Sequence, residues 1–360
     1  MLIEKRKKNY LNFKNINYVI RHPIILKNII EGKSREEIRA NARRLKELQA
    51  ERLCLQESQK FISSLKKTSP SYPSNQNYQP KLNRLCYIED WDNKDFKNIV
   101  NDFQNPTYED YIYKKSWSNK TISRRKSGFI HRKDWEWTLG IIAMKRFGKL
   151  NINSKAIGVA SAHEVILFYL ANRLNHVYAT DLYEPKYTYT PTDFPENPRK
   201  YAPFPYKEDA LTALRMDGTK LEFPSDSFDI AFSFSSIEHF GGENHSGALK
   251  GLKEIERVLK PGGIAVITTE FMLNNKEHIE FFNEQTIYSD LIDKVERLKL
   301  VEPLDLRVTT KTLDTVMDYP DVVKWDTSDG NDEFKKTHPV IIIRVNDILL
   351  TSVMLVFQKQ

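Results

Sequence analysis

The feature that most constrains the fold is an alternation of short apolar segments with helix-length stretches in the second half of the chain. The strand candidates are 156–159, 177–180, 213–216, 229–234 and 264–269. Strands joined by helix-length crossovers form right-handed βαβ units and a parallel sheet covered on both faces. Segments 340–345 and 349–357 are separated by only a short turn around Asn346 and Asp347, so they predict a hairpin with one antiparallel strand. We therefore expect an α/β, Rossmann-like fold.

The first third of the chain predicts a helical extension. Ser34 and Glu37 have the spacing of a capping box, and Leu48, Leu55 and Ile62 repeat every seven residues. A helix over 34–66 would pack on the α/β domain or on a second copy in a homo-oligomer, and the pattern leaves both open. We expect a basic helical extension at 1–67, a linker rich in Pro, Ser, Asn and Gln at 68–80, an irregular connecting region at 81–132 and the α/β domain at 133–360.

The positive charge of the chain is local. Residues 1–50 hold 13 Lys and Arg against 5 Asp and Glu, whereas the other 310 residues hold 42 against 43. A near-neutral remainder argues against a nucleic-acid groove in the α/β domain. The basic arm is either a solvated tail or a contact for an acidic partner, a nucleic acid or an anionic membrane surface. No apolar run of about 18 residues or secretory signal is present, so we expect a cytoplasmic protein, with peripheral contact at the inner membrane face through the arm.

Cysteine and histidine usage predicts neither disulfides nor a metal. Only Cys54 and Cys86 occur, which fits no zinc pattern. The candidate ligands around the later strands are scattered over separate loops without ligand spacing: Glu238, His239, His245, Glu270 and His278.

Small residues follow the first strand and a carboxylate ends the second. Gly158, Ala160 and Ala162 let a ligand approach the backbone at the carboxyl end of a strand. Asp181 stands 23 residues after Gly158, where a carboxylate can accept hydrogen bonds from the hydroxyls of a ribose. This spacing indicates a nucleoside-containing cofactor and leaves S-adenosylmethionine (SAM) and nicotinamide cofactors open.

Three further blocks resemble the class I SAM-dependent methyltransferases of the small-molecule, UbiE-like type. They are the residues Met216-Asp217-Gly218-Thr219, the stretch from Phe223 to Phe240, and Arg257-Val258-Leu259-Lys260-Pro261-Gly262-Gly263. The resemblance extends over roughly 156–269 and through the terminal hairpin. It implies a seven-stranded sheet with an antiparallel last strand and SAM as the cofactor. A nicotinamide-dependent dehydrogenase would lack the block at Asp217 and the reversed strand.

Carried over by position, the resemblance implies a cofactor site at the tips of neighbouring strands. Gly158, Ala160 and Glu164 would line the methionine end of SAM, Asp181 would hold the ribose, and Asp217 would pair with the adenine. The remaining implied cofactor residues are Leu182, Met216, Gly218, Ser233 and Ser235. The first motif reads G-x-A-x-A where the family usually has G-x-G-x-G, so its Cβ atoms would push the cofactor slightly outward.

Methyl transfer from a sulfonium mainly requires alignment, and a base is needed only for a weak nucleophile such as a hydroxyl. Glu238 and His239 follow the fourth strand of the βαβ series and are the candidate catalytic residues, with His239 either a base or a substrate-positioning group. The acceptor is a small molecule or a glycan. The glycan follows from a likeness, through Arg132-Lys133-Asp134-Trp135-Glu136-Trp137 and 232–242, to a bacterial subgroup associated with surface polysaccharide synthesis. The alternative is a catalytically inactive SAM-binding scaffold or regulatory protein.

Overall fold

The computed structural model describes residues 35–72, 79–104, 129–185, 190–327 and 332–360. These residues belong to two units that divide between Phe61 and Ile62. Residues 1–34 of the basic arm, which include the capping residue Ser34, lie outside the described residues. None of the helices in the described ranges is long and apolar enough to cross a membrane.

The predicted long helix is present as α4, Arg35–Thr68. Glu36 and Glu37 lie in its first turn and Lys66 and Lys67 in its last, which complements the helix dipole. Leu48 and Leu55 of the seven-residue repeat are exposed on it. Oligomerisation through this helix remains a prediction.

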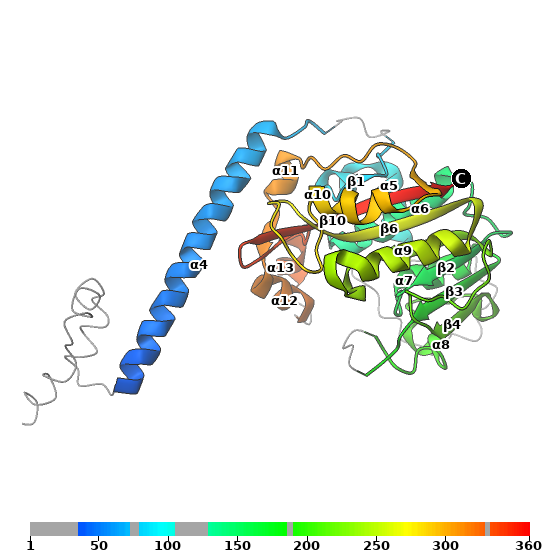
Figure 1. The fold of residues 1–360 in the computed structure, drawn as a ribbon, viewed down its shortest axis with the longest axis horizontal. Helices are drawn as coiled ribbons and strands as arrows, with labels where there is room; N and C mark the ends of the chain where they lie inside the picture. Colours follow the sequence, from blue (N-terminus) through cyan, green and yellow to red (C-terminus); the bar gives the residue numbers. More distant parts are fainter. Residues whose placement is uncertain (1–34, 73–78, 105–128, 186–189, 328–331) are drawn as a thin grey trace, which may run out of the picture. The chain divides into compact units, whose positions relative to one another are not determined.

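The second unit is built on one mixed sheet with the order β4-β3-β2-β5-β6-β10-β9-β8. Figure 1 labels β2, β3, β4, β6 and β10 of this sheet. The strands β4, β3, β2, β5 and β6 run parallel to one another, whereas β10 is antiparallel to both β6 and β9. The α/β fold with a reversed terminal hairpin is therefore confirmed. The strands of this path are β2 Lys155–Val159, β3 His176–Asp181, β4 Leu211–Arg215, β5 Phe228–Phe234, β6 Leu259–Met272, β8 Val316–Asp318, β9 Ile342–Val345 and β10 Ile348–Lys359.

The described sheet has ten strands rather than the seven implied by the resemblance. Besides the eight above, β1 (Arg84–Leu85) and β7 (Leu298–Leu300) pair with different parts of the long strand β10. β10 is 12 residues long, whereas β1, β7 and β9 have two to four residues each. Several short strands can therefore share its outer edge.

Burial along the strands follows their place in the sheet. Strands β2, β5 and β10 are buried along nearly their whole length, as strands covered on both faces should be. Edge strand β4 alternates between buried and more exposed residues. Between β5 and β6, the Lys260 to Gly263 turn appears as an irregularity in the ladder, because Phe228 pairs with Leu259 but Ile230 pairs with Ile264.

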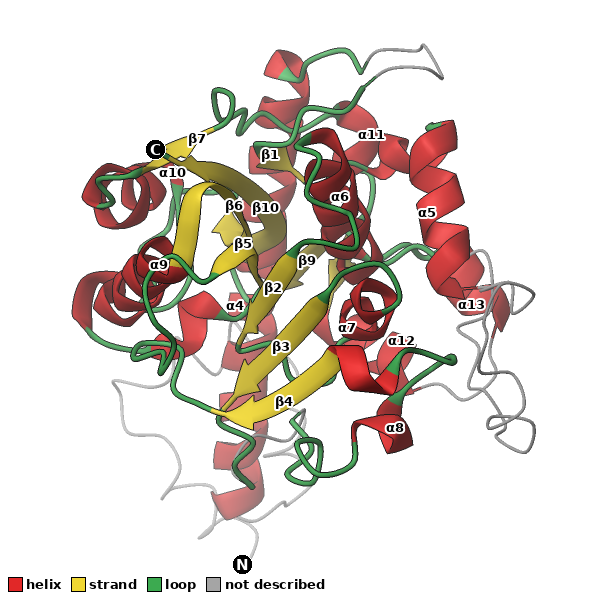
Figure 2. Cartoon of the chain, turned by 90° about the vertical axis from the view of Figure 1, so that its right-hand side faces the viewer, coloured by secondary structure: helices red, strands yellow, loops and turns green. Residues whose placement is uncertain are grey.

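Helices cover both faces of the sheet, with α5, α6 and α7 on one side and α9 and α10 on the other (Figure 2). The α-helices of this unit are α5 Lys94–Gln104, α6 Arg132–Arg146, α7 Val165–Ala171, α8 Pro198–Tyr201, α9 Ser246–Val258, α10 Glu284–Thr286, α11 Thr310–Leu313, α12 Tyr319–Thr327 and α13 Asp332–Thr337. Shorter helical turns are η1 Ile88–Asp92, η4 Glu208–Ala210, η5 Ile237–Phe240, η6 Glu243–His245, η7 Ile287–Leu291 and η8 Ile292–Lys294.

The aromatic segment between β3 and β4 packs on the body of the unit. The Phe194 ring lies edge-on against Phe168 of α7 and stacks on Tyr183. Phe194, Phe204 and Tyr206 are at most 2% exposed. These contacts pack the described part of the segment against α7 and the residue Tyr183 after β3.

Candidate active site

Asp181 ends β3 beside the loop that follows β2. Its Oδ2 accepts a hydrogen bond from the Ala162 amide at 3.0 Å and its Oδ1 a longer one from Tyr183 at 3.5 Å. Burial raises the pKa of Asp181, and these backbone amides act in the opposite direction. No cation pairs with this carboxylate among the described residues. A carboxylate has about four acceptor positions, so Asp181 keeps capacity for further donors.

Backbone strain gathers at the same edge of the sheet. Ala160 and Ala162 after β2, Tyr183 after β3 and Ser235 after β5 all have φ between 41° and 51°. Left-handed backbone costs a non-glycine residue roughly 1–2 kcal/mol. Such strain is typical of ligand sites. The alanines thus adopt the conformation that glycine would adopt in a G-x-G-x-G loop.

Asp217 lies one strand over from Asp181. The Met216 amide donates to the Asp181 carbonyl at 2.9 Å, which ties the ends of β3 and β4 together. Asp217 is exposed, and its Oδ1 accepts from the amide and the hydroxyl of Thr219, both at 2.8 Å. The structure therefore brings Asp181 and Asp217 to the same edge, with half-buried Leu182 and buried Met216 beside them.

Gly218 is required by close packing. A Cβ at Gly218 would lie 2.6 Å from the Phe240 ring, and one at Gly251 of α9 would lie equally close to the same ring. Phe240 is therefore inserted between two glycines, which fixes the turn η5 that carries Glu238 and His239. Gly158 is similarly confined, because its Cβ would lie 2.8 Å from Phe232.

Lys133, near the start of α6, reaches into the loop after β2. Its Nζ lies 2.9 Å from Glu164 Oε1 and donates to the Phe234 carbonyl at 2.6 Å. Burial opposes the charge of this ammonium, but Glu136 and Glu164 raise its pKa. Lys133 thus connects the predicted methionine end of the site with the tip of β5.

Glu136 is the centre of a buried polar network under these strand tips. Its carboxylate accepts from the hydroxyls of Ser235 at 2.9 Å, Ser352 at 2.6 Å and Thr268 at 3.1 Å, and pairs with Lys133 at 3.0 Å. Burial works against ionisation, yet Lys133 and Arg132 hold the pKa of Glu136 below its ordinary value. The network fixes the wall after β5 that includes Ser235.

A second pair of carboxyl groups lies beside this network. Glu238 is 3% exposed, and its Oε1 accepts from the Glu270 amide at 3.2 Å. Arg132 pairs with Glu270 Oε1 at 2.5 Å. The second oxygens of Glu238 and Glu270 are both buried without a partner in the described part of the chain. Burial, and then the charge of Glu270, raise the pKa of Glu238 to about 8.

The other predicted residues are less closely associated. His239 is exposed and lies 3.6 Å from Glu280. Ser233 is fully buried, and its hydroxyl has no partner among the residues described. No group of three metal-ligating side chains occurs in those residues. Arg132, Lys133 and Glu136 belong to the segment that carries the likeness to the polysaccharide subgroup but were not predicted as site residues; they share one helical turn at spacings of three and four.

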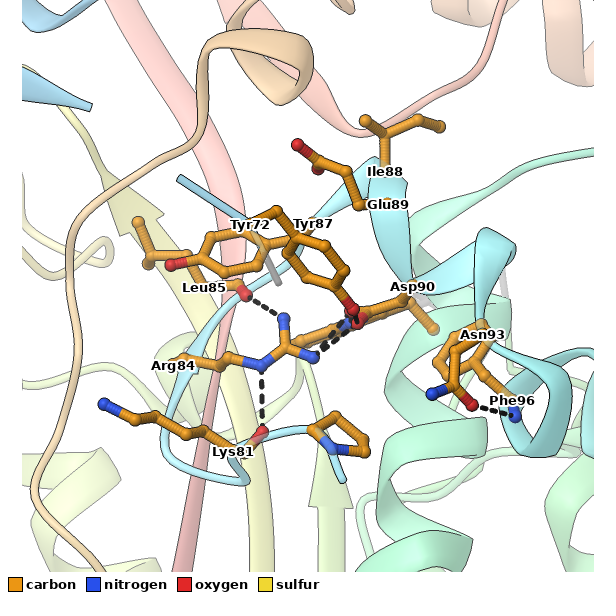
Figure 3. Close-up of polar contacts among 12 residues, drawn as sticks. Tyr72, Lys81, Arg84, Leu85, Tyr87, Ile88, Glu89, Asp90, Asn93 and Phe96 are labelled. Carbon is orange, nitrogen blue, oxygen red and sulfur yellow. Dashed lines mark hydrogen bonds and ion pairs between the residues drawn. The ribbon is translucent and has the colours of Figure 1, made fainter. Parts of the chain in front are cut away.

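Helix α6 is held in place by Asp90 of η1. The Asp90 carboxylate accepts two hydrogen bonds of 2.7 Å from Arg84 (Figure 3) and one of 2.6 Å from the Trp135 indole. Tyr72 adds a fourth at 2.8 Å. Arg84, Asp90 and Trp135 are at most 2% exposed. This buried hub fixes the helix that presents Arg132 and Lys133.

Residues 158–267 match the family model described as a methyltransferase domain. The chain carries a SAM-dependent methyltransferase domain. The match begins at Gly158 in β2 and ends at Ile267 in β6, so it spans Asp181, Asp217 and Glu238. Its methyl donor is S-adenosylmethionine.

The comparison with curated sequences gives no match, and three similar solved structures share little sequence identity with the chain. Among solved structures, the [4+2]-cyclase SpnF is 14% identical with a TM-score of 0.40, covering 62% of this chain and 80% of SpnF. A SAM-dependent methyltransferase from Aquifex aeolicus is 16% identical, with a TM-score of 0.34 and coverage of 59% and 87%. Geranyl diphosphate C-methyltransferase from Streptomyces coelicolor A3(2) is 12% identical, with a TM-score of 0.39 and coverage of 70% and 100%.

The methyltransferase site fits SAM at the ribose position. Asp181 offers acceptor capacity to two neighbouring hydroxyls and has no competing cation among the described residues. When bound, SAM supplies a methyl group activated on a sulfonium. Asp181 would hold its ribose, and the loop with Ala160 and Glu164 would hold its methionine end.

Replacing Asp181 tests this placement directly. We expect Asp181→Ala to weaken SAM binding roughly 10- to 100-fold, because hydrogen bonds to a charged acceptor contribute about 1.5–3 kcal/mol. Calorimetric titration with SAM and with S-adenosylhomocysteine (SAH) would measure the loss. Asp209→Ala, at an exposed acid of η4, is the matched control. Equal affinities in the two variants would contradict the assignment.

Proposed function

We propose that this methyltransferase methylates a hydroxyl oxygen of a small-molecule or glycan acceptor, with Glu238 as the proton acceptor. The observation that carries the proposal is the buried Glu238 carboxyl group, which has one unpartnered oxygen and a pKa raised to about 8. A hydroxyl is a weak nucleophile whose proton must leave during transfer. A base with a pKa near the working pH is suited to accept it.

The balanced reaction needs no further co-reactant. SAM would supply its methyl group to the acceptor oxygen and leave as neutral SAH, and the Glu238 carboxylate would accept the hydroxyl proton. The Glu270 amide on β6 donates to Glu238 at 3.2 Å, and the Glu270 carboxylate in turn pairs with Arg132 of α6 at 2.5 Å. We assign His239, exposed on the same turn η5, to positioning of the acceptor.

A panel of acceptors tests the class of substrate. The purified full-length protein would be incubated with SAM and with nucleotide sugars, oligosaccharides, phenols or primary amines, and SAH release would be followed. We expect release with hydroxyl compounds and a methyl ether in the product by mass spectrometry and NMR. Asp181→Ala should lower the signal strongly when SAM is limiting, because it weakens SAM binding. Methylation confined to amines would overturn the hydroxyl proposal, and SAM binding without any release would favour the scaffold alternative.

The glycan acceptor has its own test in the source organism. If the acceptor is a surface glycan, a deletion strain should yield glycan fragments lighter by one methylene unit. Complementation with the wild-type gene should restore the mass, and complementation with the Asp181→Ala gene should not. An unchanged glycan profile in the deletion strain would remove the glycan and leave the small-molecule acceptor.

A further inference from the structure

The cluster at the start of α6 contains more acidic than basic side chains. Its cations are Arg132 and Lys133, and its carboxyl groups are Glu136, Glu164, Glu238 and Glu270. Lys133 bridges Glu136 and Glu164, and Arg132 pairs with Glu270. Glu238 is the carboxyl group left without an ion pair among the described residues. Its ionisation would add a second uncompensated negative charge to a buried site, which is costly.

The groups around Glu238 do not relieve this charge. The charges of Glu270 on β6 and, to a smaller extent, Glu136 on α6 repel an ionised Glu238. Lys133 on α6 attracts it only weakly. Arg132 of α6 is engaged by Glu270. From α9, Gly247 and Gly251 lie against Phe240 of the turn η5. On the turn itself, His239 is exposed and faces Glu280.

The cluster is continuous with the cofactor loop. Lys133 contacts Glu164 after β2 and the Phe234 carbonyl at the tip of β5, and Glu238 follows that tip by four residues. The donor and the product of the reaction differ in one charge, because SAM carries a sulfonium and SAH a neutral thioether. Both share the same ammonium and carboxylate. A buried site with surplus negative charge can therefore distinguish them by charge alone.

We propose that Glu238, coupled to Glu270, is the residue that distinguishes donor from product: it is protonated in the free protein and releases its proton when SAM, but not SAH, binds. This inference rests on SAM as the donor and requires no particular acceptor. It deepens the proposed function, because SAM binding would leave Glu238 ionised and ready to accept a proton. After transfer the proton remains on Glu238 beside neutral SAH, and it leaves when fresh SAM replaces the product.

The sign of the pH effect follows from linkage. Glu238 is protonated in the free protein below a pKa of about 8. Binding that releases one proton becomes more favourable as pH rises, so the dissociation constant for SAM should fall about tenfold per pH unit below that pKa. Above it, Glu238 is already ionised and the affinity for SAM should level off. The affinity for SAH should show no such slope.

Calorimetry on the full-length protein tests this without turnover. Titrations with SAM and with SAH in phosphate and in Tris, whose ionisation enthalpies differ, report the protons released on binding. Near neutral pH we expect close to one more proton released with SAM than with SAH. Glu238→Gln should abolish that difference and the pH slope while SAM still binds. Glu243→Gln, at an exposed acid in η6, should keep both.

A second variant guards against a folding defect in Glu238→Gln. Glu270→Gln removes the repulsion from Glu238, which should then be ionised in the free protein and release less proton on SAM binding. Equal proton release with SAM and SAH in wild type, or a difference that persists in Glu238→Gln, would overturn the inference. If the inference failed in this way but hydroxyl acceptors were still methylated, the proposed function would hold. If methylation were confined to amines, the proposed function would fail, and the proton measurement would still test the inference.

Discussion

Glu238→Gln should lower kcat by roughly 10²- to 10⁴-fold, the contribution typical of a general base. Glutamine keeps the size of the side chain and an oxygen that can accept from the Glu270 amide, but it cannot take a proton. Initial rates of SAH release with a hydroxyl acceptor found in the panel would measure the loss. SAM affinity at pH values above about 8 should change far less, because binding there requires no proton release.

Two further variants locate the effect. His239→Asn should mainly raise KM for the acceptor, since His239 is exposed at the edge of η5 and Glu238 is buried in it. Glu243→Gln should behave like wild type. If His239→Asn lost as much kcat as Glu238→Gln, the assignment of the base to Glu238 would fail and His239 would take that role.

Asp90→Ala should reduce the free energy of unfolding by about 3–5 kcal/mol, because it leaves the buried Arg84 guanidinium without its partner. Burial lowers the pKa of Arg84, but Asp90 more than offsets this in the native protein. The substitution also removes the acceptor for the Trp135 indole and the Tyr72 hydroxyl. Denaturant unfolding of both proteins would measure the difference.

Asp92→Ala is the matched control from the same turn η1. Asp92 pairs with Lys311 at 2.8 Å, but both side chains are more than half exposed. An exposed ion pair contributes about 0–1 kcal/mol, so the stability of this variant should change little. If Asp90→Ala were no less stable than Asp92→Ala, the buried hub would not be what anchors α6.

The parts of the fold that were predictable from sequence are those specified by local patterns. Strands β2, β3 and β5 occur within one residue of the predicted segments, since uninterrupted apolar runs flanked by turns define buried parallel strands. The hairpin of β9 and β10 was also predictable, because only two residues separate its strands. The very short strands β1 and β7 were not, because two or three residues have no periodicity and β1 pairs with residues over 260 positions away.

The site residues also divide into those that local sequence patterns predict and those that only the packing brings together. Asp181 ends β3 and Asp217 lies two residues after the end of β4, so topology alone places them at one edge. Lys133 and Glu164 are 31 residues apart, and Glu270 and Glu238 meet across two strands. Such contacts depend on how α6 packs over β5 and β6, which no spacing in the sequence records. The raised pKa of Glu238 is likewise a property of burial and of neighbours brought together by folding.

The position of β10 has a consequence for biosynthesis. This strand follows every other described strand in the chain, yet it lies inside the sheet and pairs with β1, β6, β7 and β9. During translation the buried edge of β6 must therefore stay open until residues 348–359 have left the ribosome. An open apolar edge invites pairing with other chains. The nascent protein should depend on chaperones until β10 has been made, and truncations within residues 348–359 should accumulate as aggregates.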